Sequence, residues 1–192
     1  MLFWLAEICF AQPVLLVVGD SLSAAFQIPP ESGWVALLEH KLKTIYPTAT
    51  VINSSIVGDT SANALARLPR LLEKYHPDII IIEMGGNDGL RGLPLVALEA
   101  NLRNMILLSL KAHSKVLLCE MRLPPNYGPS YTESFQKIYT QLSVDYKISL
   151  VPFLLEKVAL DPKLMLSDRL HPNAQAQALL LEAIWPVLKA AL

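Results

Sequence analysis

Cysteine is scarce in this sequence, and so is charge of either sign. The chain has two cysteines, Cys9 and Cys119, which are too few for a disulfide framework or for a zinc site built on cysteine. Its 16 Lys and Arg residues nearly balance its 17 Asp and Glu residues, and neither sign forms a long run. Proteins that bind nucleic acid normally carry a clustered basic surface, so we expect no nucleic-acid partner.

No stretch of the chain is long and apolar enough for a transmembrane helix, although the mean hydropathy is +0.38. The most apolar stretch, residues 1–18, is interrupted by Glu7, Gln12 and Pro13. These residues come well before the roughly 20 apolar residues that a spanning helix needs. We therefore expect no stable membrane insertion.

The first residues have features of a secretory signal. An apolar run from Leu2 to Phe10 ends in Cys9-Phe10-Ala11, a small-x-small cleavage pattern, although no positively charged region precedes it. We interpret residues 1–11 as the remnant of a signal peptide and expect a periplasmic or secreted protein. If this segment is not a signal, we expect the protein in the cytoplasm.

The remaining residues, 12–192, are long and apolar enough for one globular domain. Hydrophobic residues make up 53% of the chain. A chain of this length buries roughly 70% of its unfolded surface and needs no disulfide or metal to fold.

Short apolar runs alternate with longer stretches of helical periodicity. The runs predicted to be strands are Val14–Val18, Thr50–Ile56, Asp78–Met84, Lys115–Met121 and Ile148–Pro152. The stretches predicted to be helices are Gly33–Tyr46, Ser61–Tyr75, Leu95–His113, Ser130–Tyr146 and Pro172–Leu192. Pro69 should kink the second helix or mark a junction between two helices. This alternation predicts an α/β fold with a mainly parallel five-stranded sheet covered on both faces.

Small and polar residues collect where the predicted strands end. The segments are Gly19–Ser23, Val57–Thr60, Gly85–Gly89 and, in the last long loop, Asp168–Pro172. In an open parallel sheet, ligands bind beyond the carboxyl ends of the strands, so these segments should share one edge.

Ser21 is the candidate nucleophile of this edge. A serine hydroxyl attacks at neutral pH only when a base takes its proton, and His171 is the best candidate base. Asp168, three residues earlier, can accept the Nδ1 proton of His171 and leave Nε2 facing the serine.

An oxyanion formed by attack on a carbonyl needs donors that are already in place. The backbone N–H groups of Ser21 and Gly58 and the side-chain amide of Asn87 can supply them from three strand ends. Gly58 has no Cβ to block the approach of a substrate to its N–H.

Each segment also has a simpler interpretation. Gly-Asp-Ser is a common turn sequence, Asp168 and His171 could cap a helix starting near Pro172, and residues 85–88 could be only a turn with positive φ. The catalytic interpretation is favoured because the segments together supply one complete set of roles.

These segments resemble the conserved blocks of SGNH, or GDSL-type, esterases. The matching runs are Gly19-Asp20-Ser21-Leu22, Gly58-Asp59-Thr60-Ser61, the eight residues from Gly85 to Gly92, and Asp168-x-x-His171-Pro172. Residues 65–69 and 122–128 further resemble the bacterial periplasmic subgroup of multifunctional thioesterases, proteases, lysophospholipases and arylesterases.

The resemblance implies a three-layer, flavodoxin-like α/β/α sandwich. It also implies the triad Ser21, Asp168 and His171, with Ser21, Gly58 and Asn87 as oxyanion donors. Ala25-Phe26 and Arg169-Leu170 depart from the usual residues of the subgroup without removing a catalytic atom.

The expected substrates are acyl esters, thioesters and lysophospholipids. Apolar residues on loops beside the strand ends could contact an acyl chain: Leu90, Leu93, Leu123, Pro124 and Tyr127. A carbohydrate O-acetylesterase is the alternative, and a non-catalytic flavodoxin-like binding module is a remote one, because the first turn lacks a Gly-rich phosphate cradle. No cofactor, metal or obligatory protein partner is expected.

Overall fold

The protein is built on a five-stranded parallel sheet with the spatial order β2-β1-β3-β4-β5. The structure, a computed structural model, describes residues 12–192. The strands are β1 (Val14–Gly19), β2 (Thr50–Asn53), β3 (Ile79–Glu83), β4 (Lys115–Cys119) and β5 (Ser149–Val151). All five residues of β3 are buried, as are all but the first of β1. Such continuous apolar runs are typical of parallel strands that are covered on both faces.

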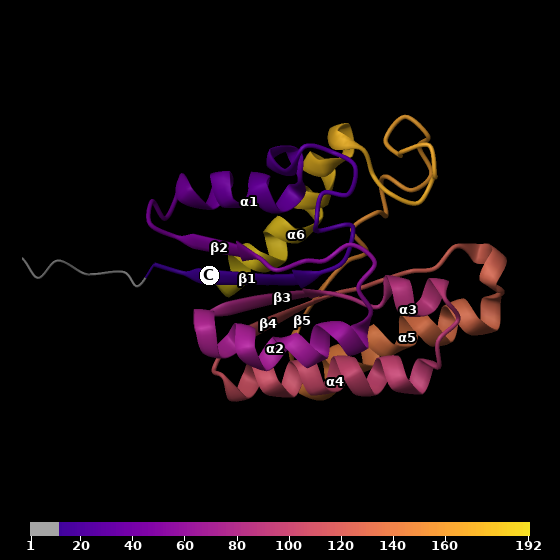
Figure 1. The fold of residues 1–192 in the computed structure, drawn as a ribbon, viewed down its shortest axis with the longest axis horizontal. Helices are drawn as coiled ribbons and strands as arrows, with labels where there is room; N and C mark the ends of the chain where they lie inside the picture. The colour runs from indigo at the N-terminus through magenta and orange to yellow at the C-terminus, as the bar shows by residue number, and fades with distance from the viewer. Residues whose placement is uncertain (1–11) are drawn as a thin grey trace, which may run out of the picture.

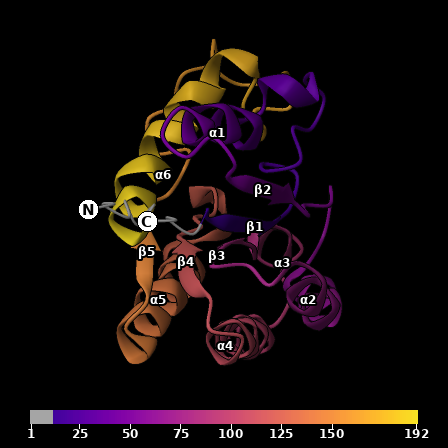
Figure 2. The same cartoon turned by 90° about the vertical axis from the view of Figure 1, so that its left-hand side faces the viewer.

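Helices cover both faces of the sheet. The long helices are α1 (Trp34–Lys43), α2 (Ser61–Tyr75), α4 (Leu95–Lys111), α5 (Pro129–Tyr146) and α6 (Gln177–Ala191). Helices α1 and α6 lie on one face, and α2, α4 and α5 lie on the other (Figure 2). The structure thus confirms the predicted three-layer α/β/α sandwich.

The strand order places the ends of β1 and β3 side by side. Their register pairs Gly19 with Glu83, although β2 lies between the two strands in the chain. In sheets of this order the chain reverses its direction of winding between these two strands, and a crevice opens beyond their carboxyl ends. The short helix α3 (Gly86–Leu90) and the loops before α5 and α6 gather at this end of the sheet (Figure 1).

The second strand is shorter than predicted. It ends at Asn53 instead of Ile56, because the Asn53 side chain accepts a hydrogen bond from the N–H of Ser55 and bends the chain into a turn. The N–H groups of Ser54 and Ile56 still donate to Val17 and Gly19, so the segment follows β1 without forming a strand.

The structure also bears on two predictions that involve proline. Of the two effects predicted for Pro69, a kink or a junction, the junction is excluded, because α2 continues through Pro69 as one helix. Pro69 is exposed, so its ring, which has no N–H to donate, lies on the outer side of the helix. The last helix begins at Gln177 rather than at Pro172, because Asn173 caps a 3₁₀ turn of residues 174–176 first.

Among residues 12–192, none of the helices has the length and apolar character that a membrane span requires. The predicted signal remnant, residues 1–11, lies outside the described residues.

Candidate active site

Ser21 lies in a buried turn directly after β1. We call residues 19–23 the nucleophile turn. The N–H of Ala24 donates to the carbonyl of Asp20, which coils the turn tightly, and Ser21 is 9% exposed. The Oγ atom of Ser21 lies 2.9 Å from Nε2 of His171. The nucleophile turn therefore presents the hydroxyl to the imidazole across 150 residues of sequence.

His171 is held by a turn that also carries Asp168. Oδ2 of Asp168 lies 2.7 Å from Nδ1 of His171, and Oδ1 accepts hydrogen bonds from the N–H groups of Leu170 and His171 at 2.9 and 3.0 Å. Because an ionised carboxylate only accepts, Nδ1 carries the proton and Nε2 is free to accept the proton of Ser21.

The Asp168 carboxylate stays ionised over the whole neutral and mildly acidic range. Partial burial alone would raise its pKa, but hydrogen bonds from His171 and Leu170 outweigh this and lower the pKa to about 2. The carboxylate is therefore available to fix the imidazole.

The ring of Phe26 packs against the imidazole ring of His171. Its ring centroid lies 4.4 Å from that of His171, with the planes tilted by 44°. This contact was not predicted from the sequence, because no local pattern indicates that the loop after β1 meets the loop before α6. The aromatic contact limits the movement of the His171 ring.

Asn87 projects from the first turn of α3. Its Nδ2 donates to Oδ2 of Asp20 at 3.1 Å, which orients the amide with its nitrogen toward the nucleophile turn. An amide nitrogen has two hydrogens, so one remains for a substrate oxygen.

Gly58 lies in the turn after β2 with φ +76, a conformation that favours glycine. The carbonyl of Gly58 accepts a hydrogen bond of 2.8 Å from Nη2 of Arg91, which ties the turn to the segment after α3. Gly58 does not line the cavity that contains Ser21.

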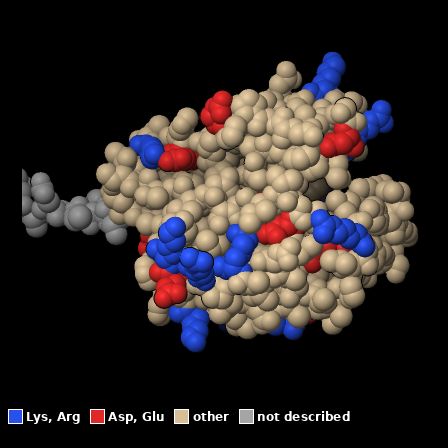
Figure 3. Space-filling model, in the orientation of Figure 1, with Lys and Arg blue, Asp and Glu red and all other residues tan. Residues whose placement is uncertain are grey.

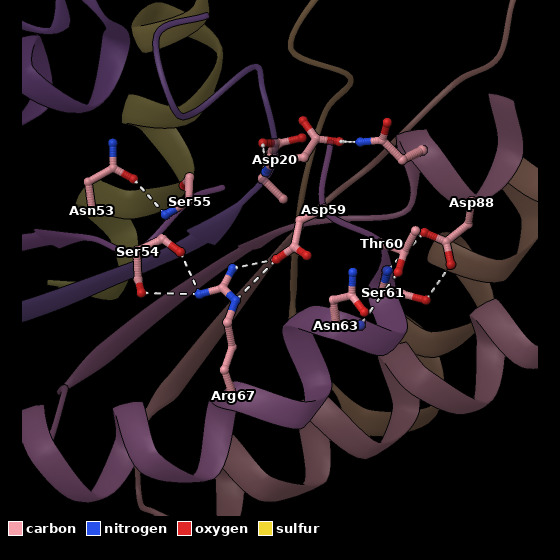
Figure 4. Close-up of polar contacts among 12 residues, drawn as sticks. Asp20, Asn53, Ser54, Ser55, Asp59, Thr60, Ser61, Asn63, Arg67 and Asp88 are labelled. Atoms are coloured by element: carbon pink, nitrogen blue, oxygen red, sulfur yellow. Dashed lines mark hydrogen bonds and ion pairs between the residues drawn. The ribbon is translucent and has the colours of Figure 1, made fainter. Parts of the chain in front are cut away.

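Two carboxylates anchor this turn (Figure 4). Asp59 pairs with Arg67, whose Nη2 lies 2.9 Å from Oδ2, and Arg67 also donates to the carbonyl of Ser54. Asp88 accepts hydrogen bonds from the N–H and Oγ–H of Ser61. The turn after β2 is thus bonded to α2 through Asp59, and the start of α2 is bonded to α3 through Asp88. These bonds stabilise the position of Gly58.

Asp20 is a buried carboxylate that bonds to several groups of the site. Its Oδ1 accepts the N–H of Leu22 at 3.1 Å, while Oδ2 holds Asn87. Burial raises the pKa of Asp20 to about 6, and the bond from Leu22, the nearby His171 and the bond from Asn87 oppose this rise. Asp20 is therefore mostly ionised at neutral pH.

A cavity of about 100 Å³ opens at Ser21. Ser21, Asn87 and His171 line it together with three of the five predicted acyl-chain residues, Leu90, Leu123 and Pro124. Its other apolar walls are Leu22, Met121, Phe153, Leu155 and Leu170. Met121, Phe153 and Leu155 follow the ends of β4 and β5, and this position after a strand end is the sequence signal that indicates them.

The two other predicted acyl-chain residues do not line this cavity. The hydroxyl of Tyr127 donates to the carbonyl of Leu90 at 2.9 Å, and its ring stacks on that of Tyr131. The carbonyl of Leu93 accepts a hydrogen bond from the hydroxyl of Tyr131. Tyr127 thus contacts the end of α3, and Leu93 is bonded to α5.

Charge is dispersed over the face seen in Figure 3, where Lys and Arg side chains are interspersed with Asp and Glu on a mostly uncharged surface. Among residues 12–192, no three His, Cys, Asp or Glu side chains are grouped as a metal ion would require.

Comparison with known proteins assigns the family. Residues 17–179 match the GDSL-like lipase/acylhydrolase family. The chain is 48% identical to the esterase TesA of Pseudomonas aeruginosa over 179 residues, which cover 93% of this chain and 89% of that protein. It is 42% identical to thioesterase 1/protease 1/lysophospholipase L1 of Escherichia coli strain K12, over 87% of this chain and 79% of that protein.

A solved structure has the same fold. The psychrotrophic esterase EstA from Pseudoalteromonas sp., inhibited by monoethylphosphonate, matches with a TM-score of 0.89 and 40% identity, over 93% of this chain and 98% of that one. With the family match and the relatives above, this shows that the chain is an esterase that belongs to the GDSL-like lipase/acylhydrolase family.

Proposed function

We propose that this esterase hydrolyses carboxylic esters and thioesters of acyl chains through an acyl-enzyme on Ser21. The observation that carries the proposal is the chain of contacts from Ser21 Oγ to His171 Nε2, 2.9 Å, and from His171 Nδ1 to Asp168 Oδ2, 2.7 Å, beside an apolar cavity.

In the first half of the reaction, Ser21 Oγ attacks the carbonyl carbon of the substrate while Nε2 of His171 takes the hydroxyl proton. The carbonyl double bond opens to an oxyanion, which the N–H groups of Ser21 and Gly58 and the amide of Asn87 stabilise. Each such donor lowers the barrier by about 3 kcal/mol. The intermediate collapses, the bond to the leaving group breaks, and the alcohol or thiol leaves with the proton from His171.

In the second half, a water molecule attacks the acyl-enzyme. His171 takes one proton of the water and returns it to Ser21 Oγ when the carboxylic acid leaves. Asp168 stabilises the imidazolium in both halves without taking its proton.

An acyl chain is the part of the substrate that suits the cavity. Leu90, Leu123 and Pro124 line the cavity together with Ser21, and Tyr127 donates a hydrogen bond to the carbonyl of Leu90 from outside the cavity. The relatives named esterase and thioesterase/lysophospholipase favour esters and thioesters alike. The mostly apolar walls favour a hydrocarbon chain over an acetylated sugar, because the few polar side chains of the lining, Asp20, Asn87 and Arg122 among them, could pair with only some of the sugar hydroxyls. We expect acyl esters of medium chain length to be hydrolysed faster than an acetylated sugar.

The test is a Ser21→Ala variant. It should lose hydrolysis of a p-nitrophenyl acyl ester and covalent labelling by a fluorophosphonate, with an unchanged melting temperature. Ser134→Ala, at an exposed position of α5, is the matched control and should label like the wild type. Full labelling of Ser21→Ala would refute the assignment of the nucleophile.

We further infer that residues 12–192 form one domain and that residues 1–11 are a signal remnant. The apolar run before Ala11 supports export to the periplasm or medium. The mass of the protein recovered from cells would show whether the segment is removed.

A further inference from the structure

Glu83 is a carboxyl group in the middle of the fold that the catalytic steps above do not use. It is the last residue of β3 and is 0% exposed. The parallel register places it beside Gly19, at the start of the nucleophile turn. No ion pair with Glu83 forms within residues 12–192.

Two donors of the nucleophile turn converge on one oxygen of this carboxyl. Oε2 of Glu83 accepts a hydrogen bond of 2.7 Å from Oγ of Ser23 and one of 3.2 Å from the N–H of Asp20. The two donors flank Ser21 in the sequence. The second oxygen, Oε1, is buried and has no hydrogen-bond partner among the described residues.

The nucleophile turn packs closely against the side chain of Glu83. A Cβ atom at Gly19 would lie 2.6 Å from Oγ of Ser23 and 2.7 Å from Oε2 of Glu83, distances that no real side chain tolerates. A side chain at this position would force Ser23 or Glu83 to move.

The surroundings of Glu83 disfavour a negative charge. The titratable groups that face it are Asp20 at the end of β1, Cys119 on β4 and Tyr139 on α5, none of them cationic. Burial, and the nearby charge of Asp20, raise the pKa of Glu83 well above its usual value. An ionised carboxylate with Oε1 unpartnered would be very costly in this site, and a neutral carboxyl costs much less.

We propose that Glu83 is a positioning residue that acts as a neutral carboxylic acid. It holds the two ends of the nucleophile turn, Asp20 N–H and Ser23 Oγ–H, so that Ser21 directs its hydroxyl at His171 and its N–H at the oxyanion. The proposal rests on the serine hydrolase mechanism above. Glu83 acts by position, because both hydrogen bonds given above go to the turn and Glu83 does not line the cavity that contains Ser21.

Glu83→Ala and Glu83→Gln separate this role from simple loss of stability. Glu83→Ala leaves both donors of the turn without a partner, and we expect kcat to fall by about 10- to 100-fold, since a misplacement of about 1 Å at a reacting group has an effect of this size. KM should change by less than about threefold, because most of the cavity walls come from other segments. Glu83→Gln keeps a neutral side chain with an acceptor oxygen, so kcat should return to within about threefold of the wild type, with an unchanged pH profile near neutrality.

The matched control is Ile82→Ala, on the same strand and equally buried but with a side chain that cannot form hydrogen bonds. It should lower the melting temperature without changing kcat per active site, measured by titrating active sites with a fluorophosphonate at a temperature where all variants are folded. If Glu83→Ala does not fold, Ser23→Ala tests the proposal instead, because it removes the hydrogen bond from Ser23 to Glu83. We expect it to lower kcat by about fivefold.

Two outcomes would overturn the proposal. One is a kcat of Glu83→Ala, or of Ser23→Ala in its place, equal to that of the control. The other is a Glu83→Gln variant as inactive as Glu83→Ala, which would mean that the charge is required. Failure of the serine mechanism itself would be seen separately, as labelling that survives Ser21→Ala.

Discussion

Replacing Asp168 by asparagine should almost abolish catalysis while leaving the fold intact. Oδ1 of Asp168 accepts hydrogen bonds from the N–H groups of Leu170 and His171, and Oδ2 accepts from Nδ1 of His171 at 2.7 Å. An asparagine has one acceptor oxygen, and the two backbone donors of the turn will fix that oxygen in the Oδ1 position. Its NH₂ group must then face Nδ1 of His171.

The consequence is the wrong tautomer of His171. Nδ1 becomes an acceptor, Nε2 carries the proton, and the imidazole can no longer take the proton of Ser21. A carboxylate-to-amide change in this position of a serine hydrolase lowers kcat by about 10⁴-fold. This corresponds to a rise in the barrier of about 5.5 kcal/mol, at 1.36 kcal/mol for each factor of ten.

The assay is the hydrolysis of a p-nitrophenyl acyl ester near neutral pH, together with thermal melting. The melting temperature of Asp168→Asn should stay close to that of the wild type, because the turn keeps its backbone hydrogen bonds. Asp168→Ala is the matched comparison: it loses these bonds and should melt lower by about 2–4 °C, for a loss of about 1 kcal/mol. A loss of kcat below about tenfold in Asp168→Asn would refute the proposed role of Asp168.

Two more changes test other polar groups of the site. Asn87→Ala should lower kcat by about 10²-fold with little effect on KM, because the amide is needed for the oxyanion rather than the bound ester; steady-state kinetics showing an effect on KM alone would contradict this. Asp20→Asn tests the raised pKa. Since the pKa of Asp20 is about 6 in the folded protein and 3.8 ordinarily, its buried charge destabilises the fold at neutral pH by about 3 kcal/mol, and this cost disappears as the pH falls through 6 toward 3.8. The wild type should therefore gain stability relative to Asp20→Asn between about pH 7 and about pH 4, and a constant difference in melting temperature would count against the raised pKa.

Much of the site was predictable because its residues follow strand ends. A strand that is apolar on both faces is recognisable from its sequence, and the residues directly after it must lie at one edge of a parallel sheet. Ser21 and Asn87 were predicted in this way. Asp168 and His171 were predicted as a pair, because the geometry between them depends on a short turn and not on the rest of the fold.

The cavity walls were less predictable. Leu90, Leu123 and Pro124 line the cavity, but Tyr127 turns its hydroxyl to the carbonyl of Leu90 and contributes no wall. Composition identifies an apolar loop residue but does not indicate which way its side chain points.

The sequence by itself determined the α/β class, the approximate strands and helices, and the chemical identity of the candidate nucleophile, base and carboxylate. These follow from periodicity and turn chemistry, which are local properties of the chain. Only the tertiary structure decided that Phe26 packs on His171 and that Glu83 supports the nucleophile turn. Ser23 and Glu83 are 60 residues apart, and they meet because β1 and β3 are neighbours in a fixed register. Strand order and register arise from packing the whole chain around one core, so no local pattern contains them.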